Sequence, residues 1–297
     1  MNRWNFLTTR GNNHAHSQRR PSGIAPRAAF LCLVSSSVLA QPVSASSQDP
    51  EPITPVVAFA IPPARAQPIV GERLHYHGYW LGIPVGSGWI EVKELIELDG
   101  RQVYHLEAQG HSNELLSTFY PIHDVVHSYL DAQTLKPLRF EKYQREGHYR
   151  ADEIVTFDYA AAKATYRSLL NQSVKEIPLP NEVQDLISAV YWFRAQPMAQ
   201  TTFLRMNLYS DEKVYETDIR LSRVLPLELL KRGTFSCLMA EPRASFKGLL
   251  VKRGRLWAYL TADAHRLPLL VKMTTPWGPM SAVLDEESIP PSVHRIS

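Results

Sequence analysis

The sequence has only two cysteines among its 297 residues, which excludes a fold held together by disulfides. Cys32 lies in an apolar run near the N-terminus, and Cys237 stands alone in the rest of the chain. A lone thiol cannot form an intramolecular disulfide, so stability must come from packing. Cys237 alternates with Phe235 and Met239 and has no neighbouring base. We therefore expect a buried structural thiol rather than a nucleophile.

Acidic residues are missing from the first forty positions, which hold five arginines. The whole chain has a formal charge of +3, but taking these five from its 32 basic residues leaves 27 against 29 acidic ones, a charge of −2. A protein that binds nucleic acid would keep a basic patch on its folded part. We therefore expect no nucleic-acid partner.

Long hydrophobic runs are missing as well. The apolar run at residues 28–40 is shorter than the about 20 residues that a membrane-spanning helix needs. It follows the arginines and ends in Val38-x-Ala40, a pattern typical of a cleaved secretory signal peptide. Cys32 lies near the start of this run, whereas lipidation requires a cysteine at its end. Residues 1–40 are thus predicted to be a signal peptide, and the mature protein is predicted to be periplasmic, without a lipid anchor or transmembrane span. General secretion is favoured over the twin-arginine route, and the true start site stays open.

The remaining chain divides into a leader, one domain and a tail. Residues 41–68 are rich in proline and are expected to form an extended leader or linker. From residue 69 the pattern has a period of two: Leu74, Tyr76 and Trp80 lie on one face of a predicted strand. Residues 69–288 are predicted to form a single β-rich domain, and residues 289–297 a tail.

Strand-like runs follow one another at short spacing through this domain. Asp99-Gly100 predicts a tight hairpin turn between two of them. Further strands are predicted near 125–131, 137–146, 151–159, 163–170, 202–209, 213–222, 234–240, 246–251, 255–261, 267–274 and 280–285. Strands this short and numerous predict a mostly β fold, a large antiparallel, open or nearly closed β-barrel-like sheet with one principal helix.

The helix is predicted between Pro180 and Pro197, where apolar residues have helical spacing. Asn181 is the expected N-cap, with Gln184 as its capping-box partner. The polar residues Asp185, Ser188, Tyr191 and Arg194 recur every three positions, so that neighbours in the series can touch. These residues could line a site, but we favour a polar network of Asp185, Ser188 and Arg194 that anchors the helix to the sheet.

Catalytic signatures are also missing. The sequence has no G-x-S-x-G elbow, and the glycine-rich segment 82–88 lacks the Lys-Ser/Thr that binds phosphate and magnesium. The segment is expected to be a turn with a bulge, and no cofactor is expected.

Histidines give the remaining candidates for a site. His123 and His127 have the spacing of zinc ligands on a helix, but Val125-Val126 favours a strand, so a metalloprotease is disfavoured. His75 and His77 share one face of a strand and are the candidate metal ligands, with His105 and His111 expected nearby. The favoured interpretation is that they are polar-face histidines and that no metal is bound.

Several short motifs together resemble one bacterial family. They are Gly71-Glu72-x-Leu74-x-Tyr76, Gly82-Ile83-Pro84-Val85-Gly86, Asp131-x-x-Thr134-Leu135-x-Pro137, Phe157-Asp158, the segment from Val183-Gln184-Asp185 to Arg194, and Asp263-x-x-x-Leu267-Pro268. In this order they resemble the domain-of-unknown-function 3108 family over residues 69–285. The resemblance implies an exported, mostly β protein and supplies no catalytic residues.

The leading interpretation is an exported periplasmic binding protein without catalysis, for a lipid or other apolar small molecule or for an envelope protein. The candidate ligand-binding side chains are Trp80, Trp89, Trp192 and Tyr191. Two alternatives stay open. One is an envelope hydrolase or metal-dependent enzyme whose site is assembled only in three dimensions. The other is a structural partner of an outer-membrane assembly machine.

Export makes the first testable prediction. The protein recovered from the cell envelope should begin at Gln41 or, after cleavage at Val43-x-Ala45, at Ser46. N-terminal sequencing measures this directly. An intact Met1 on the folded protein would contradict both the periplasmic location and the assignment of the basic charge to a removed segment.

Overall fold

The computed structural model describes residues 67–296 except 198–202, 230–231, 246–254 and 276. The predicted signal peptide, most of the predicted leader and the predicted strand at 246–251 lie outside the described residues. The strand prediction is otherwise confirmed: the fold is mostly β, and the strand predicted at 137–146 has these bounds in the structure.

The first half of the fold is a series of antiparallel hairpins. Its elements are β1 (Arg73–Trp80), β2 (Ile83–Leu98), β3 (Arg101–Ser112), α1 (Glu114–Ser117), β4 (His123–Asp131), β5 (Pro137–Glu146), β6 (Tyr149–Asp158), β7 (Lys163–Ser168) and β8 (Val174–Pro178). Asp99 and Gly100 form the turn between β2 and β3 with φ values of 50° and 76°. Positive φ at both positions is what the predicted Asp-Gly hairpin turn requires.

The second half contains the principal helix and the returning strands. Its elements are β9 (Val183–Gln184), α2 (Ser188–Ala195), β10 (Phe203–Ser210), β11 (Lys213–Leu221), β12 (Leu225–Leu229), β13 (Gly233–Ser245), β14 (Leu256–Thr261), β15 (Pro268–Thr275), β16 (Gly278–Leu284), the 3-10 helix η1 (Glu286–Ser288) and β17 (Arg295–Ile296). No helix among the described residues is long and apolar enough to cross a membrane.

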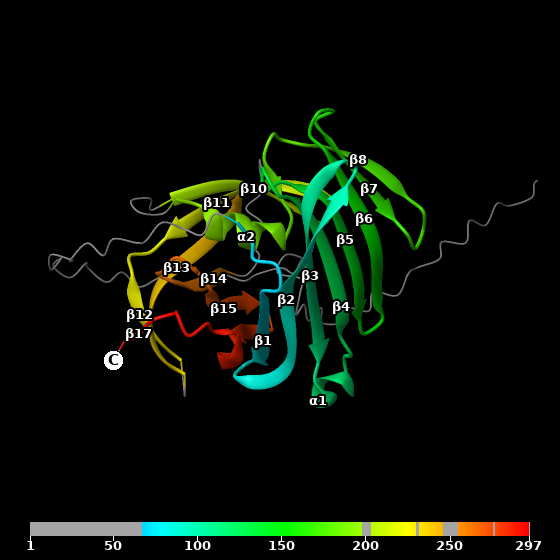
Figure 1. The fold of residues 1–297 in the computed structure, drawn as a ribbon. Coiled ribbons are helices and arrows are strands. Elements are labelled where there is room, and N and C mark those ends of the chain that lie inside the picture. The colour runs from blue at the N-terminus through cyan, green and yellow to red at the C-terminus, as the bar shows by residue number, and fades with distance from the viewer. Residues whose placement is uncertain (1–66, 198–202, 230–231, 246–254, 276, 297) are drawn as a thin grey trace, which may run out of the picture.

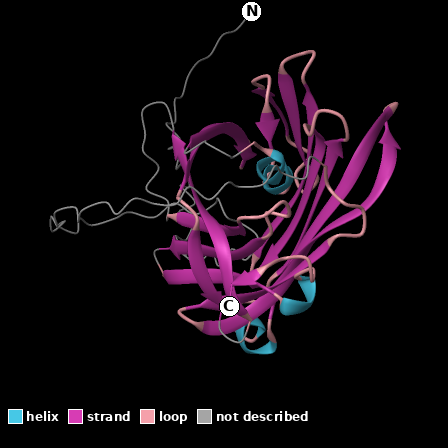
Figure 2. Cartoon of the chain, turned by 60° about the vertical axis from the view of Figure 1, so that its left-hand side comes forward, coloured by secondary structure: helices cyan, strands magenta, loops and turns pink. Residues whose placement is uncertain are grey.

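One strand joins the two halves into a single sheet. On one side β1 pairs with β2, and the ladder continues strand by strand to β8. On its other side β1 pairs with β16, and the ladder continues through β15, β14 and β13 to β11 and β10. The sheet curls without closing, and α2 lies between its two arms (Figure 1). Figure 2 shows the same helix, in cyan, enclosed by strands.

The described residues form three clusters of buried apolar side chains. The first lies on β2 to β8 and includes Leu106, Val126 and Phe157. The second lies under β1, β13, β15 and β16 and includes Cys237, which is fully buried as predicted. The third joins α2 to β11, β13 and β14 through Phe193. Burial raises the pKa of Cys237 to about 12, so its thiol is neutral and structural.

The helix is shorter than the sequence predicts. It spans eight residues, and the segment before it pairs as β9 with β10. The predicted N-cap Asn181 is exposed and lies ahead of β9, so this prediction was wrong. Asp185 caps the helix instead: its carboxylate accepts hydrogen bonds from the backbone N–H groups of Ile187 and Ser188, at 2.8 Å each. The competing β pairing of residues 183–184 makes the helix begin later than predicted.

The C-terminal segment predicted to be a tail is part of the fold. Ile289 and Val293 are buried in the second cluster, and β17 pairs with β13. The widely spaced apolar residues Ile289, Val293 and Ile296 gave too weak a pattern to predict this packing.

A buried ion pair ties α2 to the first strand. The guanidinium of Arg194 donates two hydrogen bonds to the carboxylate of Glu72, at 2.6 and 2.7 Å, just before β1. Arg266, which is 1% exposed, donates to the carbonyl oxygens of Arg194 and Gln196 at the C-terminal end of α2. A cation at this end satisfies the last carbonyl groups of the helix and its dipole.

The ion pair leads to the second prediction. Arg194→Met should lower the free energy of unfolding by about 3–5 kcal/mol, because it leaves a mostly buried carboxylate unpaired. Chemical denaturation measures this.

Two further variants act as controls. Glu72→Leu combined with Arg194→Met should recover part of the loss, because no buried charge is left unpaired. Lys163→Met, which breaks a surface pair with Glu176, should melt close to the wild type. If Arg194→Met is as stable as the wild type, the pair does not hold the helix in place.

Candidate metal centre

Two histidines and a glutamate meet on the outer face of β3 and β4. Leu106 and Val126 point into the first core cluster. Side chains alternate along a strand, so His105, Glu107 and His127 must lie on the opposite face. The strand register sets Glu107 directly across from His127.

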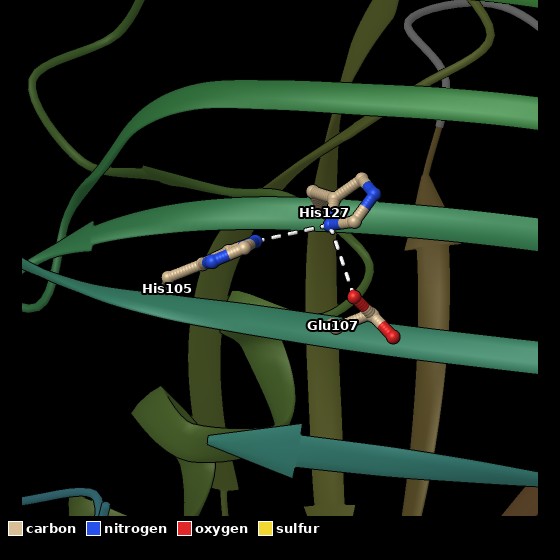
Figure 3. Close-up of side chains that lie close together, drawn as sticks. All are labelled: His105, Glu107 and His127. Atoms are coloured by element: carbon tan, nitrogen blue, oxygen red, sulfur yellow. Dashed lines mark hydrogen bonds and ion pairs between the residues drawn. The ribbon is translucent and has the colours of Figure 1, made fainter. Parts of the chain in front are cut away.

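The three side chains converge to within 4.8 Å of one another (Figure 3). His105 Nε2 and His127 Nδ1 are 3.0 Å apart and share a hydrogen bond. His127 Nδ1 lies 3.6 Å from Glu107 Oε2. Ligand atoms around a tetrahedral zinc ion lie about 3.3 Å apart, given zinc–ligand bonds of about 2.0–2.2 Å. The spacing of the cluster therefore suits a small transition-metal ion.

The protonation states of His127 and Glu107 also favour the binding of a metal ion. Burial, which outweighs the attraction of Glu107, lowers the pKa of His127, so its imidazole is neutral at pH 7 with a lone pair to offer. Burial opposes ionisation of Glu107, but hydrogen bonds from Lys93 and Gln109 outweigh it and lower its pKa. The site thus combines neutral imidazole with carboxylate, the ligands that zinc and its neighbours prefer.

Neighbouring side chains fix the ligands in place. Lys93 Nζ donates to Glu107 Oε2 at 2.8 Å, and Gln109 Nε2 donates to Oε1 at 2.7 Å. The ring of Tyr129 stacks on His105 with their centroids 4.8 Å apart. The Lys93 ammonium is also a positive charge beside the carboxylate, and it competes with a metal ion for Glu107.

The metal ligands considered in the sequence lie elsewhere. His75 and His77 are exposed on the outer face of β1, where His77 Nε2 lies 2.6 Å from Asp285 Oδ2. His123 and His127 lie on a strand, as their β-branched neighbours predicted, and only His127 joins the cluster among the described residues. His105 was named as a neighbour and Glu107 was missed. The signal that could have found them is the His105-x-Glu107 spacing, which places both side chains on one face.

The aromatic residues predicted to bind a ligand lie in different surroundings. Trp80 is 38% exposed, and its Nε1 donates to the carbonyl oxygen of Trp277. Trp89 lies on the outer face beneath the guanidinium of Arg73. Trp192 packs against the third core cluster, and Tyr191 is buried in the first. Trp80, predicted to share a face with Tyr76, keeps the regular pairing of β1 with β16, and its side chain is exposed where the strand ends.

The polar residues near α2 make structural contacts. Ser128 Oγ donates to Asp185 Oδ2 at 2.6 Å, which joins the helix cap to β4. Ser188 accepts from the backbone N–H of Asp185, and Arg194 pairs with Glu72. These contacts anchor the helix to the sheet.

The fold and the site define an open, β-barrel-like protein with a histidine–carboxylate cluster on its outer face. The sequence model of one family, described as "Protein of unknown function (DUF3108)", matches residues 74–285, and the chain belongs to this family. No curated protein matches it.

A solved structure shares the fold. It is the crystal structure of a beta-barrel-like protein of domain of unknown function DUF1849 from Brucella abortus. The TM-score is 0.52 at 11% sequence identity, and the match covers 74% of this chain and 98% of that chain. A likeness at this identity concerns the fold alone.

Asp185 leads to the third prediction. Burial raises the pKa of its carboxyl to about 6 from 3.8, against hydrogen bonds from Ser128, Ile187 and Ser188 that favour the ionised form. A raised pKa means that the folded state binds the proton of Asp185 more tightly than the unfolded state does. The stabilisation of the folded state by this proton is therefore complete below pH 3.8 and is lost as pH rises through 6. The free energy of unfolding of the wild type, measured relative to that of the Asp185→Asn variant, should fall by about 3 kcal/mol between pH 4 and 7.

Denaturation of both proteins across this range measures the difference, and titration of the histidines cancels in it. A stability difference that does not change with pH would show that the hydrogen bonds offset the burial of Asp185.

Proposed function

We propose that this protein is an exported binding protein whose ligand is a transition-metal ion, held by His105, Glu107 and His127. The observation that carries the proposal is the spacing of their ligand atoms, 3.0 Å between the two imidazole nitrogens and 3.6 Å from nitrogen to carboxylate oxygen. Zinc is the first ion to test, because it accepts this ligand set in tetrahedral geometry. The arginine-rich segment followed by an apolar run supports export.

The surroundings favour binding over catalysis. Three protein ligands leave a coordination position open, as in catalytic zinc sites. However, both carboxylates that pair across the sheet with the cluster histidines have partners: Glu94 Oε1 lies 3.4 Å from His105 Nδ1, and Glu141 accepts a hydrogen bond from Tyr143 at 2.9 Å and pairs with Arg139 at 2.7 Å. A carboxylate held in this way is a poor general base. A metal-dependent hydrolase is the second candidate, because of the open position. Ester hydrolysis by the zinc-loaded protein that is lost in Glu141→Gln would favour the hydrolase.

An apolar ligand inside the barrel stays a prediction and is not part of the proposal. The four aromatic residues expected to line its site lie apart. The inner face of β5 and β6 also carries a buried ion pair between Lys142 and Glu153. A charged pair on that face is unfavourable for an acyl chain.

Metal binding gives the fourth prediction. The protein stripped of metal should bind one Zn²⁺ per chain in isothermal titration calorimetry. His127→Ala and Glu107→Gln should each weaken binding at least about tenfold, since even the loss of a residue that supports a ligand costs about 10–100-fold. Lys93→Met should strengthen binding, because it removes the cation that competes for Glu107.

Variants of the histidines on β1 are the matched controls. His75→Ala and His77→Ala should bind zinc like the wild type, although each also removes one imidazole from the outer face. Equal losses in all four alanine and glutamine variants would indicate unspecific binding and overturn the proposal. Weaker binding by Lys93→Met would contradict the role given to Glu107.

A further inference from the structure

The exposed apolar side chains gather at one end of the sheet. Thirteen large apolar residues are exposed among the described ones. Hairpins of an antiparallel ladder alternate between its two ends, so the β1–β2, β3–β4, β5–β6 and β7–β8 connections all lie at the same end. We call it the α1 end, after the helix in the β3–β4 connection (Figure 1). Eight of the thirteen lie there: Trp80, Leu81, Ile83, Leu115, Phe119, Tyr149, Leu170 and Val174.

Contacts between the connections hold these side chains together. Leu81 N donates to the carbonyl oxygen of Pro279, in the β15–β16 hairpin. Asn113, the N-cap of α1, donates from its backbone N–H to Val85 and from its side chain to Pro84. Gly147 N donates to the carbonyl oxygen of Pro121, so the β1–β2, β3–β4 and β5–β6 connections form one structured surface, in which Phe119 is 79% and Leu115 is 63% exposed.

The exposed charges on this end include the arginines Arg150 and Arg167 and one glutamate, Glu114 at the start of α1, so the arginines give an excess of positive charge that suits anionic lipid headgroups. Arg150 is exposed in the β5–β6 hairpin, and its guanidinium donates only to the carbonyl oxygens of Gly147 and Tyr149 in the contacts of the described residues. Arg167 is exposed near the end of β7, and His148 lies beside Arg150. Cations flanking exposed Trp, Tyr, Phe and Leu are the composition of surfaces that insert into the membrane interface.

We propose that the α1 end docks on a phospholipid bilayer surface, with Phe119, Leu115 and the β1–β2 turn inserted and Arg150 and Arg167 against lipid phosphates. The apolar side chains stand on the tips of separate turns, which fits a soft, flat surface better than the recessed face of a protein. The inference is independent of the metal site, since no cluster ligand lies in these connections.

Vesicle co-sedimentation tests the proposal. The chain from Gln41 to Ser297 is used, because the apolar run at 28–40 would itself bind lipid. It should bind phosphatidylcholine vesicles and bind more tightly when phosphatidylglycerol is included. Leu115→Ser combined with Phe119→Ser should weaken binding to both kinds of vesicle at least about tenfold, the effect of removing one or two buried apolar side chains. Arg150→Gln with Arg167→Gln should reduce only the gain from phosphatidylglycerol.

Leu95→Ser is the matched control, since Leu95 is 45% exposed on β2 away from the α1 end. It should bind vesicles like the wild type, and thermal melts should show that all variants are folded. Failure of the folded wild type to bind either vesicle would overturn the proposal, as would equal losses in Leu95→Ser. Self-association that is lost in the Leu115 and Phe119 variant, without vesicle binding, would instead make the α1 end an interface between copies.

Discussion

The structure depends on β1, the strand through which the described ladder passes from one arm of the sheet to the other. Its two edges pair with β2 and β16, and its inner face contributes Leu74 and Tyr76 to the core. The ion pair between Glu72 and Arg194 fixes the start of this strand to α2. The helix in turn packs against both arms, so the curl of the sheet and the position of the helix are set by the same few contacts.

Local patterns in the sequence were enough to predict the fold class. The period of two gave the strands, and Asp99-Gly100 gave a hairpin turn of the correct geometry. The N-terminus of the helix was wrong because Val183 and Gln184 pair with β10, a contact that depends on residues more than twenty positions away. The cluster of His105, Glu107 and His127 was missed for the same reason. Glu107 lies beside His127 only because the ten residues between β3 and β4 set the pairing register of these two strands.

The sequence motifs that resemble the family contain residues that stabilise the fold. Tyr76 donates its hydroxyl hydrogen to the carbonyl oxygen of Pro268, at 2.9 Å. Asp263 accepts from the backbone N–H groups of His265 and Arg266, which shapes the turn before β15. In this chain these motif residues satisfy buried polar groups. His105, Glu107 and His127 lie outside these motifs, so the candidate site is a separate feature placed on a shared scaffold.

The central claim concerns where a metal ion binds, and anomalous diffraction from a zinc-loaded crystal tests it most directly. The account predicts one anomalous peak bounded by His105, Glu107 and His127, with Lys93 displaced from the carboxylate. A peak between His77 and Asp285 instead, or none on the outer face of the sheet, would contradict it.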